Sequence, residues 1–153
     1  MQLITIYNDD CVAVIQSLPT GSFDAVITDP PYLIGFQNNK WDVADSIEDF
    51  HMHWLKEVYE KMSPGNVIKA FSATRTFHRL CSAMDKVGFQ DIQVKAWGFS
   101  QGFPHNYDVA KNLLKKAQKD PKNKEKYLSL AKVYEGYGNT LKTCFEPYCC
   151  AVR

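Results

Sequence analysis

The order of apolar and polar residues along the chain predicts short strands that alternate with amphipathic helices. Strand-like runs are found at Leu3–Tyr7, Phe23–Thr28, Val67–Phe71, Ile92–Phe99 and Phe145–Val152. Apolar residues recur with helical spacing in Cys11–Leu18, Ser46–Met62 and Thr74–Val87. Strands that alternate with helices usually form a mostly parallel sheet with helices on both faces. The pattern therefore predicts a doubly wound α/β fold.

Capping residues mark several of the predicted helix ends. Asn8 or Asp9 suits the N-cap of the first helix. Ser46 followed by Asp49 resembles a capping box, and Gly88 is typical of the residue that closes a helix. These signals place the helices independently of their apolar spacing.

The helix predicted at Ser46–Met62 has one apolar side. Phe50 and Trp54 lie on that side, and we expect them in the core. His51 and His53 are expected at the surface. No spacing of His, Cys, Asp or Glu in the sequence indicates a metal site.

A lysine-rich segment separates the last two predicted strands. Residues 108–134 read as two helices that are broken at Asp120-Pro121, which gives a helical insertion over about residues 105–138. Between residues 105 and 142 there are nine lysines and four acids, a net charge of +5, whereas the whole chain carries +1. Such a segment can neutralise nucleic-acid phosphates, or it can simply be a solvated helical face.

The composition is that of an ordinary globular protein. The chain has 153 residues, of which 45% are hydrophobic and 23% charged, so a single domain with a sizeable core is expected. No apolar run approaches the ~20 residues that span a membrane, and no secretory signal is evident. The five cysteines are odd in number and show no paired spacing, which favours reduced thiols and a cytoplasmic setting.

The run Asp29-Pro30-Pro31-Tyr32 directly follows an apolar strand. Ligands of open α/β sheets bind beyond the carboxyl ends of the strands, where Asp29 is placed. The two prolines stiffen the backbone and leave carbonyl acceptors unpaired. A carboxylate beside a free carbonyl suits an exocyclic amine, and Tyr32 offers a ring on which a base can stack. The alternative is a turn in which Asp29 only caps a backbone amide.

This sequence resembles the DNA amino-methyltransferases that act on adenine N6 or cytosine N4, most closely the permuted group common in phages and prophages. Asp29–Tyr32 matches the catalytic motif of that family, in the Asp form most often found in adenine-specific members. Four further regions resemble family segments in the same order: Ile6–Cys11, Phe71–Arg79, Gly98–Pro104, and Gly136–Lys142 followed by Glu146-Pro147.

The resemblance implies a function and a set of site residues. The implied reaction is methylation of the amine of a flipped base, with S-adenosylmethionine as cofactor and DNA as partner. Asp29, Pro30, Pro31 and Tyr32 would be catalytic, and Asp10 would help to hold the cofactor. DNA contacts are expected from residues after the third strand and from the insertion, namely Arg75, His78, Lys111, Lys115, Lys116 and Lys119. Arg75 and His78 can also serve only as polar residues at a helix start.

The F-x-G-x-G cofactor loop of the family is not found in the sequence. Gly136-Tyr-Gly138 is the only G-x-G, and it follows a helical stretch rather than a strand. We therefore expect a partial Rossmann-like methyltransferase sheet with one bare edge. Either a second chain or self-association completes this edge, or the sequence is a fragment or a reduced relative of the family. A module that binds DNA or protein without catalysis, or one subunit of a split enzyme, is the alternative.

Overall fold

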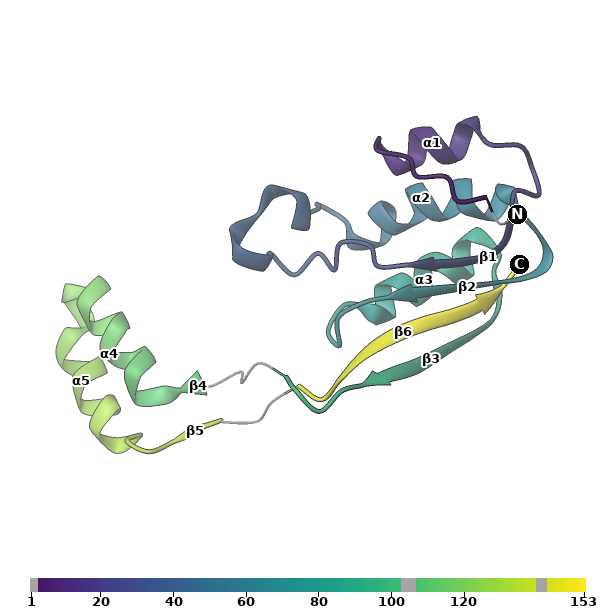
Figure 1. Cartoon of the computed structure of the whole chain (residues 1–153). Coiled ribbons are helices and arrows are strands. Elements are labelled where there is room, and N and C mark those ends of the chain that lie inside the picture. The colour runs from purple at the N-terminus through teal and green to yellow at the C-terminus, as the bar shows by residue number, and fades with distance from the viewer. Residues whose placement is uncertain (1–2, 103–106, 140–142) are drawn as a thin grey trace. The chain divides into compact units, whose positions relative to one another are not determined.

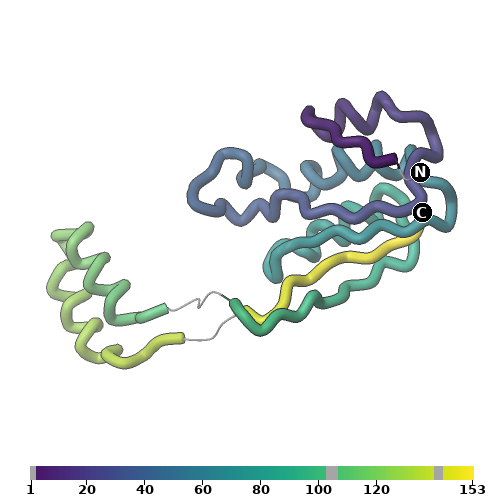
Figure 2. The backbone as a smooth tube through the Cα atoms, in the orientation of Figure 1, coloured from purple at the N-terminus to yellow at the C-terminus, as the bar shows by residue number. Residues whose placement is uncertain are grey.

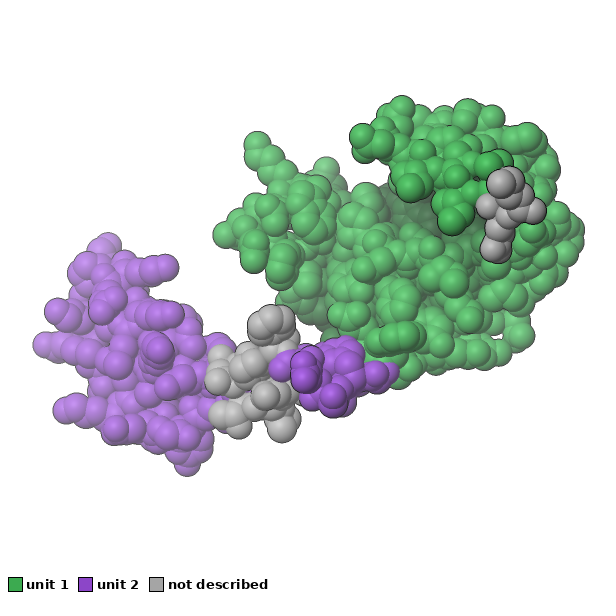
Figure 3. All heavy atoms as spheres, in the orientation of Figure 1, with its two compact units in different colours: residues 1–97, 146–153 green, residues 98–145 purple. Residues whose placement is uncertain are grey.

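The computed structural model describes residues 3–102, 107–139 and 143–153. The chain divides into two compact units, residues 1–97 with 146–153 and residues 98–145 (Figure 3). The first unit contains the elements α1 (Cys11–Ser17), β1 (Phe23–Thr28), η1 (Phe36–Asn38), η2 (Lys40–Asp42), α2 (Ile47–Lys61), β2 (Met62–Phe71), α3 (Phe77–Val87), β3 (Gln90–Gly98) and β6 (Phe145–Val152) (Figure 1).

The second unit is the predicted helical insertion, which the chain enters after β3 and leaves before β6 (Figure 2). Its elements are β4 (Tyr107–Asp108), α4 (Val109–Lys119), η3 (Pro121–Asn123), α5 (Lys124–Val133) and β5 (Gly138–Asn139). The break between its helices lies at the predicted Asp120-Pro121, because proline has no amide hydrogen for the helix and fixes its own φ. The insertion before the last strand is thus confirmed.

The sheet of the first unit has the strand order β1-β2-β6-β3. β1 runs parallel to β2, with Thr28 opposite Ala70, and β6 runs antiparallel to β2, with Tyr148 opposite Phe71. The prediction of a mostly parallel sheet is therefore wrong in one respect, since β6 returns in the opposite direction and makes the sheet mixed (Figure 1). The α/β class is confirmed.

The core lies between one face of this sheet and the helices. Ile68 and Ala70 of β2 and Cys149 and Ala151 of β6 are fully buried there, in one cluster with residues of α1, α2 and α3. The intervening residues of the same strands have the opposite orientation, where Phe71 contacts the ring of Tyr148 at 5.3 Å between centroids. The described part of the chain thus places helices on one face, not on both as expected, because all three helices pack into a single cluster.

The helix ends follow the predicted caps, with one correction. Ser46 accepts a hydrogen bond from the Asp49 amide at 3.2 Å, and Gly88 closes α3 in the left-handed conformation at φ 112°. The N-cap of α1 is Asp10, and not Asn8 or Asp9, because its Oδ1 accepts from the Ala13 amide at 3.0 Å. Asp9 instead accepts from the amide of Asp10.

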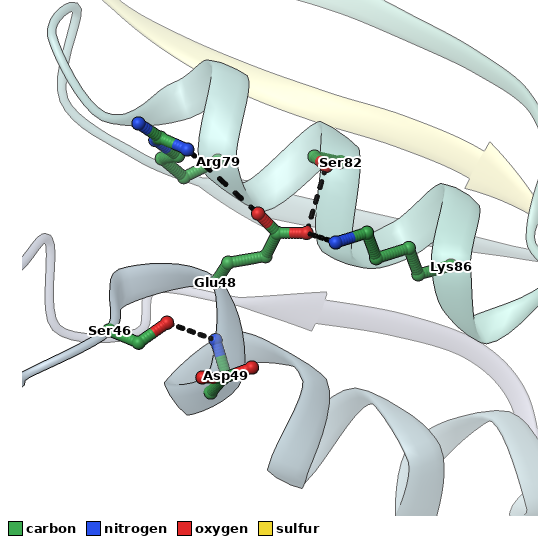
Figure 4. Close-up of polar contacts among 6 residues, drawn as sticks. All are labelled: Ser46, Glu48, Asp49, Arg79, Ser82 and Lys86. Carbon is green, nitrogen blue, oxygen red and sulfur yellow. Dashed lines mark hydrogen bonds and ion pairs between the residues drawn. The ribbon is translucent and has the colours of Figure 1, made fainter.

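A polar cluster joins α2 to α3 (Figure 4). Glu48 of α2 accepts a 3.0 Å hydrogen bond from the Ser82 hydroxyl and forms ion pairs with Lys86 and Arg79 of α3. These hydrogen bonds from Lys86 and Ser82 lower the pKa of Glu48. The first turn of α2 is thereby fixed against α3 over the core.

The first predicted strand, Leu3–Tyr7, does not form. Residues 3–8 have no regular secondary structure, and Leu3 and Ile6 are 90% and 88% exposed. A run of strand-forming residues becomes a strand only when another strand pairs with it, and no described strand lies beside these residues. The strand-like composition alone therefore misplaced this segment.

His51 is a second correction. It was expected at the surface but is 1% exposed, because it lies on the same side of α2 as Trp54 and Leu55. Its Nδ1 accepts a 3.3 Å hydrogen bond from the Trp54 indole, while its Nε2 is buried without a partner among the described residues. Burial lowers the pKa of His51 to about 4. His53 is exposed, as predicted.

Among the described helices, none has both the length and the apolar character that a membrane crossing requires.

Candidate functional site

The Asp29–Tyr32 segment leaves the sheet at the carboxyl end of β1, which is an end strand of the described sheet. Asp29 is exposed, and Pro30, Pro31 and Tyr32 are half-buried. No backbone amide of the described residues donates to the Asp29 carboxylate. Asp29 is therefore not held as a cap among the described residues, and it is exposed beyond the end of β1.

Two acidic residues affect the side chain of Tyr32, and one of them comes from another strand. Burial, followed by the interaction with Asp29 and then by the interaction with Glu146, raises the pKa of Tyr32. The hydroxyl consequently keeps its proton at neutral pH. The sequence marked Glu146-Pro147 as a family segment but gave no sign that Glu146 affects Tyr32.

Asp42 organises the loop that follows Tyr32. Its carboxylate accepts backbone hydrogen bonds from Leu33 at 2.6 Å, Ile34 at 3.1 Å and Phe36 at 2.7 Å. The side chain is only 1% exposed, and its own carbonyl accepts from Gly35. These bonds hold a tight loop in which Leu33 has a positive φ of 55°. Sequence reasoning missed Asp42, because its partners are main-chain amides that every residue carries.

Arg75 and His78 lie in the region where the sequence predicted DNA contacts. The Arg75 guanidinium donates to the Ile34 carbonyl at 3.1 Å, so it supports the same loop as Asp42. Arg75 and His78 are both exposed, and His78 packs edge-on against Phe77. Arg75 thus lies near the Asp29–Tyr32 segment, at the far side of the loop.

A groove of about 490 Å³ lies beside Pro31. It is lined by α1, the first half of α2 and the proline, through Asp10, Cys11, Val12, Ala13, Gln16, Pro31, Phe50, His53 and Trp54. Asp10 uses one carboxylate oxygen to cap α1, and the other has no partner among the described residues. The structure therefore brings Asp10 and Pro31 to one groove, whereas Asp29, Pro30 and Tyr32 do not line it. The groove is mainly apolar.

The predicted DNA-contacting lysines lie on α4 in the second unit, and all four are exposed: Lys111, Lys115, Lys116 and Lys119. Within residues 107–139, no acid pairs with a lysine side chain. α4 and α5 pack through the buried Ala117 and Ala131, so the lysine side chains remain in solvent.

Gly136 and Gly138 each have a structural reason to be glycine in the second unit. Gly138 belongs to β5, which pairs with β4, and a Cβ there would lie 2.6 Å from the Tyr107 carbonyl oxygen. Gly138 is therefore required for the close approach of the two short strands. Gly136 has a positive φ of 81°, which favours glycine.

Some features of the sequence lie partly outside the described residues. The segments Gly98–Pro104 and Gly136–Lys142 include residues 103–106 and 140–142, which the structure does not describe. Across residues 3–102, 107–139 and 143–153, no three His, Cys, Asp or Glu side chains are grouped to hold a metal ion.

The sequence of this chain matches a known protein family. A model of the N6/N4 DNA methylase family matches residues 23–143. The chain belongs to this family. The match begins at β1 and so includes the Asp29–Tyr32 segment, the loop held by Asp42 and the elements β4 to β5 of the insertion. The resemblance inferred from the sequence motifs is thus confirmed at the level of the family.

YubD of Escherichia coli (strain K12), which is named as a methylase, is similar to this chain in sequence. It is 27% identical over 85 residues, which are 54% of this chain and 37% of YubD. The chain thus spans little more than a third of this relative.

Solved structures share the fold. TTHA0409 of Thermus thermophilus, described as a DNA modification methylase, aligns with 94% of this chain and 50% of its own, at 16% identity and a TM-score of 0.56. The M1.HpyAVI–SAM complex aligns with 99% of this chain and 55% of its own, at 18% identity and a TM-score of 0.55. The fold is therefore that of Rossmann-like methyltransferases, of which the chain spans about half.

Proposed function

We propose that the chain carries the base-binding half of an S-adenosylmethionine-dependent DNA methyltransferase that modifies the exocyclic amine of a flipped base, adenine N6 in preference to cytosine N4. The observation that carries the proposal is the exposed Asp29 carboxylate beside Pro30 and Tyr32 at the open end of β1. Membership of the DNA methylase family supports it. The Asp form of the motif supports adenine.

The residues of the site have distinct roles in this reaction. Asp29 and the Pro30 carbonyl accept the two hydrogens of the target amine, and the ring of Tyr32 stacks on the base. The Asp29 carboxylate stabilises the positive charge that develops on the amine nitrogen and accepts the proton that leaves it. No side chain needs to act as a nucleophile, so the contribution of the site is positioning and electrostatics.

The groove beside Pro31 is the proposed site for S-adenosylmethionine. Its volume of about 490 Å³ lies in the usual range of ~300–1,000 Å³ for small-molecule sites. Phe50 and Trp54 offer apolar surface, and the free oxygen of Asp10 can accept a polar hydrogen. The cofactor supplies a methyl group on a sulfonium, which passes to the amine nitrogen while the electron pair of the broken bond stays on sulfur. Complexes of relatives with this cofactor support the assignment.

DNA is the proposed macromolecular partner, and α4 is the proposed backbone contact. Lys111, Lys115, Lys116 and Lys119 are exposed and unpaired in the described unit, whose net charge of +5 contrasts with that of the rest of the chain. Phosphate contacts of this kind orient the duplex without reading its sequence. Arg75 and His78, which are both exposed, are the proposed contacts to the strand near the flipped base.

A second polypeptide, or a second copy of the chain, is proposed at the edge of β1. Ile27 on this end strand is 74% exposed, and the nearby N-terminal segment exposes Leu3, Ile4 and Ile6. An open apolar edge strand favours pairing with another strand. The relatives have about as many residues again beyond the matched part, which is enough to supply such strands.

The direct test is methyl transfer from labelled S-adenosylmethionine to duplex DNA, followed by hydrolysis and separation of the modified bases. We expect N6-methyladenine. Detection of N4-methylcytosine instead would support the same mechanism with cytosine as the target base. A calorimetric titration with the cofactor, with and without DNA, separates the enzyme from the alternative of a non-catalytic binding module, which the lack of an F-x-G-x-G loop in the sequence favours. Binding of DNA with no binding of the cofactor would support that alternative.

A further inference from the structure

Two cysteines lie against each other where α3 packs on β6. Cys81 is in the second turn of α3, and Cys149 is in the middle of β6. Their Sγ atoms are 2.9 Å apart, although the residues are 68 positions apart in the sequence. Both are free thiols in this structure. A disulfide bond is about 2.04 Å long, so the two sulfurs need to approach by only about 0.9 Å to form one.

The geometry of β6 selects Cys149 and not its neighbour Cys150. Successive side chains of a strand point to opposite faces of the sheet. Cys149 and Ala151 are fully buried in the core, and Cys81 packs against the same core. Cys150 belongs to the other face and is only partly buried. The fold therefore presents one thiol of this adjacent pair to Cys81.

The two thiols differ in exposure and in how tightly they hold their protons. Cys81 is half-buried, and its hydrogen bond with Cys149 lowers the pKa of its thiol. Cys149 is fully buried, and the same hydrogen bond, followed by burial, raises the pKa of its thiol. Cys149 is therefore the donor, and Cys81 takes the thiolate form more readily. Since the thiolate is the nucleophile, Cys81 is the residue that reacts first with an oxidant in solution.

We propose that Cys81 and Cys149 are a redox-active pair that forms a reversible disulfide when the protein meets hydrogen peroxide. The Cys81 thiolate attacks one peroxide oxygen and the O–O bond breaks, which gives a sulfenic acid on Cys81. The hydroxide that leaves takes up the proton that Cys81 released and becomes water. The Cys149 sulfur then attacks the Cys81 sulfur, and the new S–S bond replaces the S–O bond. A second hydroxide leaves with the proton of Cys149 as water, so two thiols are oxidised and one peroxide is reduced to two waters.

The bond joins α3 to the sheet across the core. The loop that it closes contains the end of α3, β3 and the whole second unit. Closing a loop of this length restricts the unfolded chain, so oxidation should stabilise the folded protein. Neither cysteine lines the groove beside Pro31 or belongs to the Asp29–Tyr32 segment, so the pair is independent of the proposed methyl transfer.

Peptide mapping tests the bond directly. The full chain is treated with one equivalent of hydrogen peroxide at low protein concentration, and the remaining thiols are blocked with N-ethylmaleimide. Digestion with trypsin and chymotrypsin is followed by mass spectrometry without reduction. We expect a cross-link between the peptides of Cys81 and Cys149, which dithiothreitol removes. Cys150→Ser, which removes the thiol on the other face of β6, is the matched control and should give the same cross-link.

Thermal unfolding is the second measurement. The oxidised wild-type chain should have a Tm above that of the reduced chain by on the order of 5–15 °C, and dithiothreitol should reverse the increase. Cys81→Ala should show no increase, and because Cys81 is only half-buried, its circular dichroism spectrum should match that of the wild type. Cys11→Ser, at an exposed cysteine, should keep the full increase.

Two kinds of result would overturn the proposal. One is peroxide treatment after which Cys81 is recovered only as a blocked thiol or a sulfinic acid, or is linked to Cys150 instead of Cys149. The other is a rise of Tm in Cys81→Ala that equals the rise in the wild-type chain, because the stabilisation would then come from another oxidised group.

Discussion

The carboxylate of Asp42 accepts a 2.6 Å hydrogen bond from the backbone amide of Leu33, the residue that directly follows Tyr32. Two further amides of the same loop donate to this carboxylate. A single buried acid thus fixes the main chain next to the proposed base-binding segment. Hydrogen bonds to a charged acceptor are stronger than neutral ones, so the loop depends on this residue.

Replacement of Asp42 by alanine should destabilise the chain by about 2–4 kcal/mol, since buried amides lose their acceptor. Asp42→Asn should destabilise the chain less than Asp42→Ala, because the amide oxygen of asparagine can still accept from some of these amides. It cannot replace both oxygens of the carboxylate. Urea unfolding of each variant measures the free energy of unfolding. Asp45→Ala, at an exposed acid of the same loop, is the control and should change it by less than ~0.5 kcal/mol. Equal losses of unfolding free energy in Asp42→Ala and Asp45→Ala would contradict the role of Asp42 in holding the loop.

Stability should fall in acid because of His51. Its pKa is lowered to about 4 in the folded chain, whereas an unfolded histidine titrates near ~6.5. The unfolded state therefore takes up a proton first, and stability that is complete above pH ~6.5 is lost as the pH falls toward 4, by about 3 kcal/mol in total. His51→Gln should remove this component of the pH dependence in urea unfolding between pH 4 and 7.

His53→Gln is the control for this effect. His53 lies on the same helix but is exposed, so the variant should keep the full dependence of stability on pH. If the two glutamine variants show the same pH profile, His51 does not account for the acid sensitivity.

The Glu48 cluster should contribute a small, salt-dependent stabilisation. Glu48→Gln removes the charge that pairs with Lys86 and Arg79, so Tm should fall by a few degrees at low ionic strength and by less in 1 M salt. Because the pKa of Glu48 is lowered, its contribution is present above the ordinary pKa of a glutamate and is lost as the pH falls below it. Glu60→Gln should shift Tm little at either salt concentration, and a salt-independent loss in Glu48→Gln would argue against ion pairing.

The outcomes for individual residues show which part of the structure was accessible from the sequence. β1 and β6 have the predicted bounds, and Ser46 and Gly88 cap helices as predicted, because these features depend on local composition and backbone preference. Leu3–Tyr7 has the same local signal as a strand and fails, because pairing requires a partner that the pattern does not reveal.

The site itself was accessible only in part. Asp29–Tyr32 and Asp10 are recognisable because the motif is contiguous and its context is a strand end. The effect of Glu146 on the pKa of Tyr32 depends on a strand register, and the role of Asp42 depends on a loop conformation with positive φ at Leu33. Neither the strand register nor the loop conformation produces a periodic pattern in the sequence. The burial of His51 was missed because a histidine on an amphipathic helix suits either side.

The lysines of α4 should determine how strongly DNA binding depends on salt. Replacing Lys111, Lys115, Lys116 and Lys119 by glutamine should weaken the binding of duplex DNA and make the slope of log K against log salt less steep, by about 3 to 4 if every lysine meets a phosphate. Lys40, Lys56, Lys69 and Lys95 are also exposed but lie in the first unit, and their fourfold glutamine variant is the control. Fluorescence anisotropy over a range of salt concentrations measures both. An equal change of slope in the two variants would show that α4 has no special role.

The central claim is that Asp29 holds the amine of an unstacked base. The most direct measurement is the single-turnover rate of methyl transfer from labelled S-adenosylmethionine to duplex DNA, for the wild-type chain, Asp29→Ala and Asp24→Ala. Asp24 is an exposed acid on the same strand and serves as the control. The account predicts that Asp29→Ala lowers the rate at least ~100-fold, as the loss of a charge-stabilising group at a reacting centre does, while Asp24→Ala stays within twofold of the wild type. A rate in Asp29→Ala that equals the rate in Asp24→Ala would contradict it.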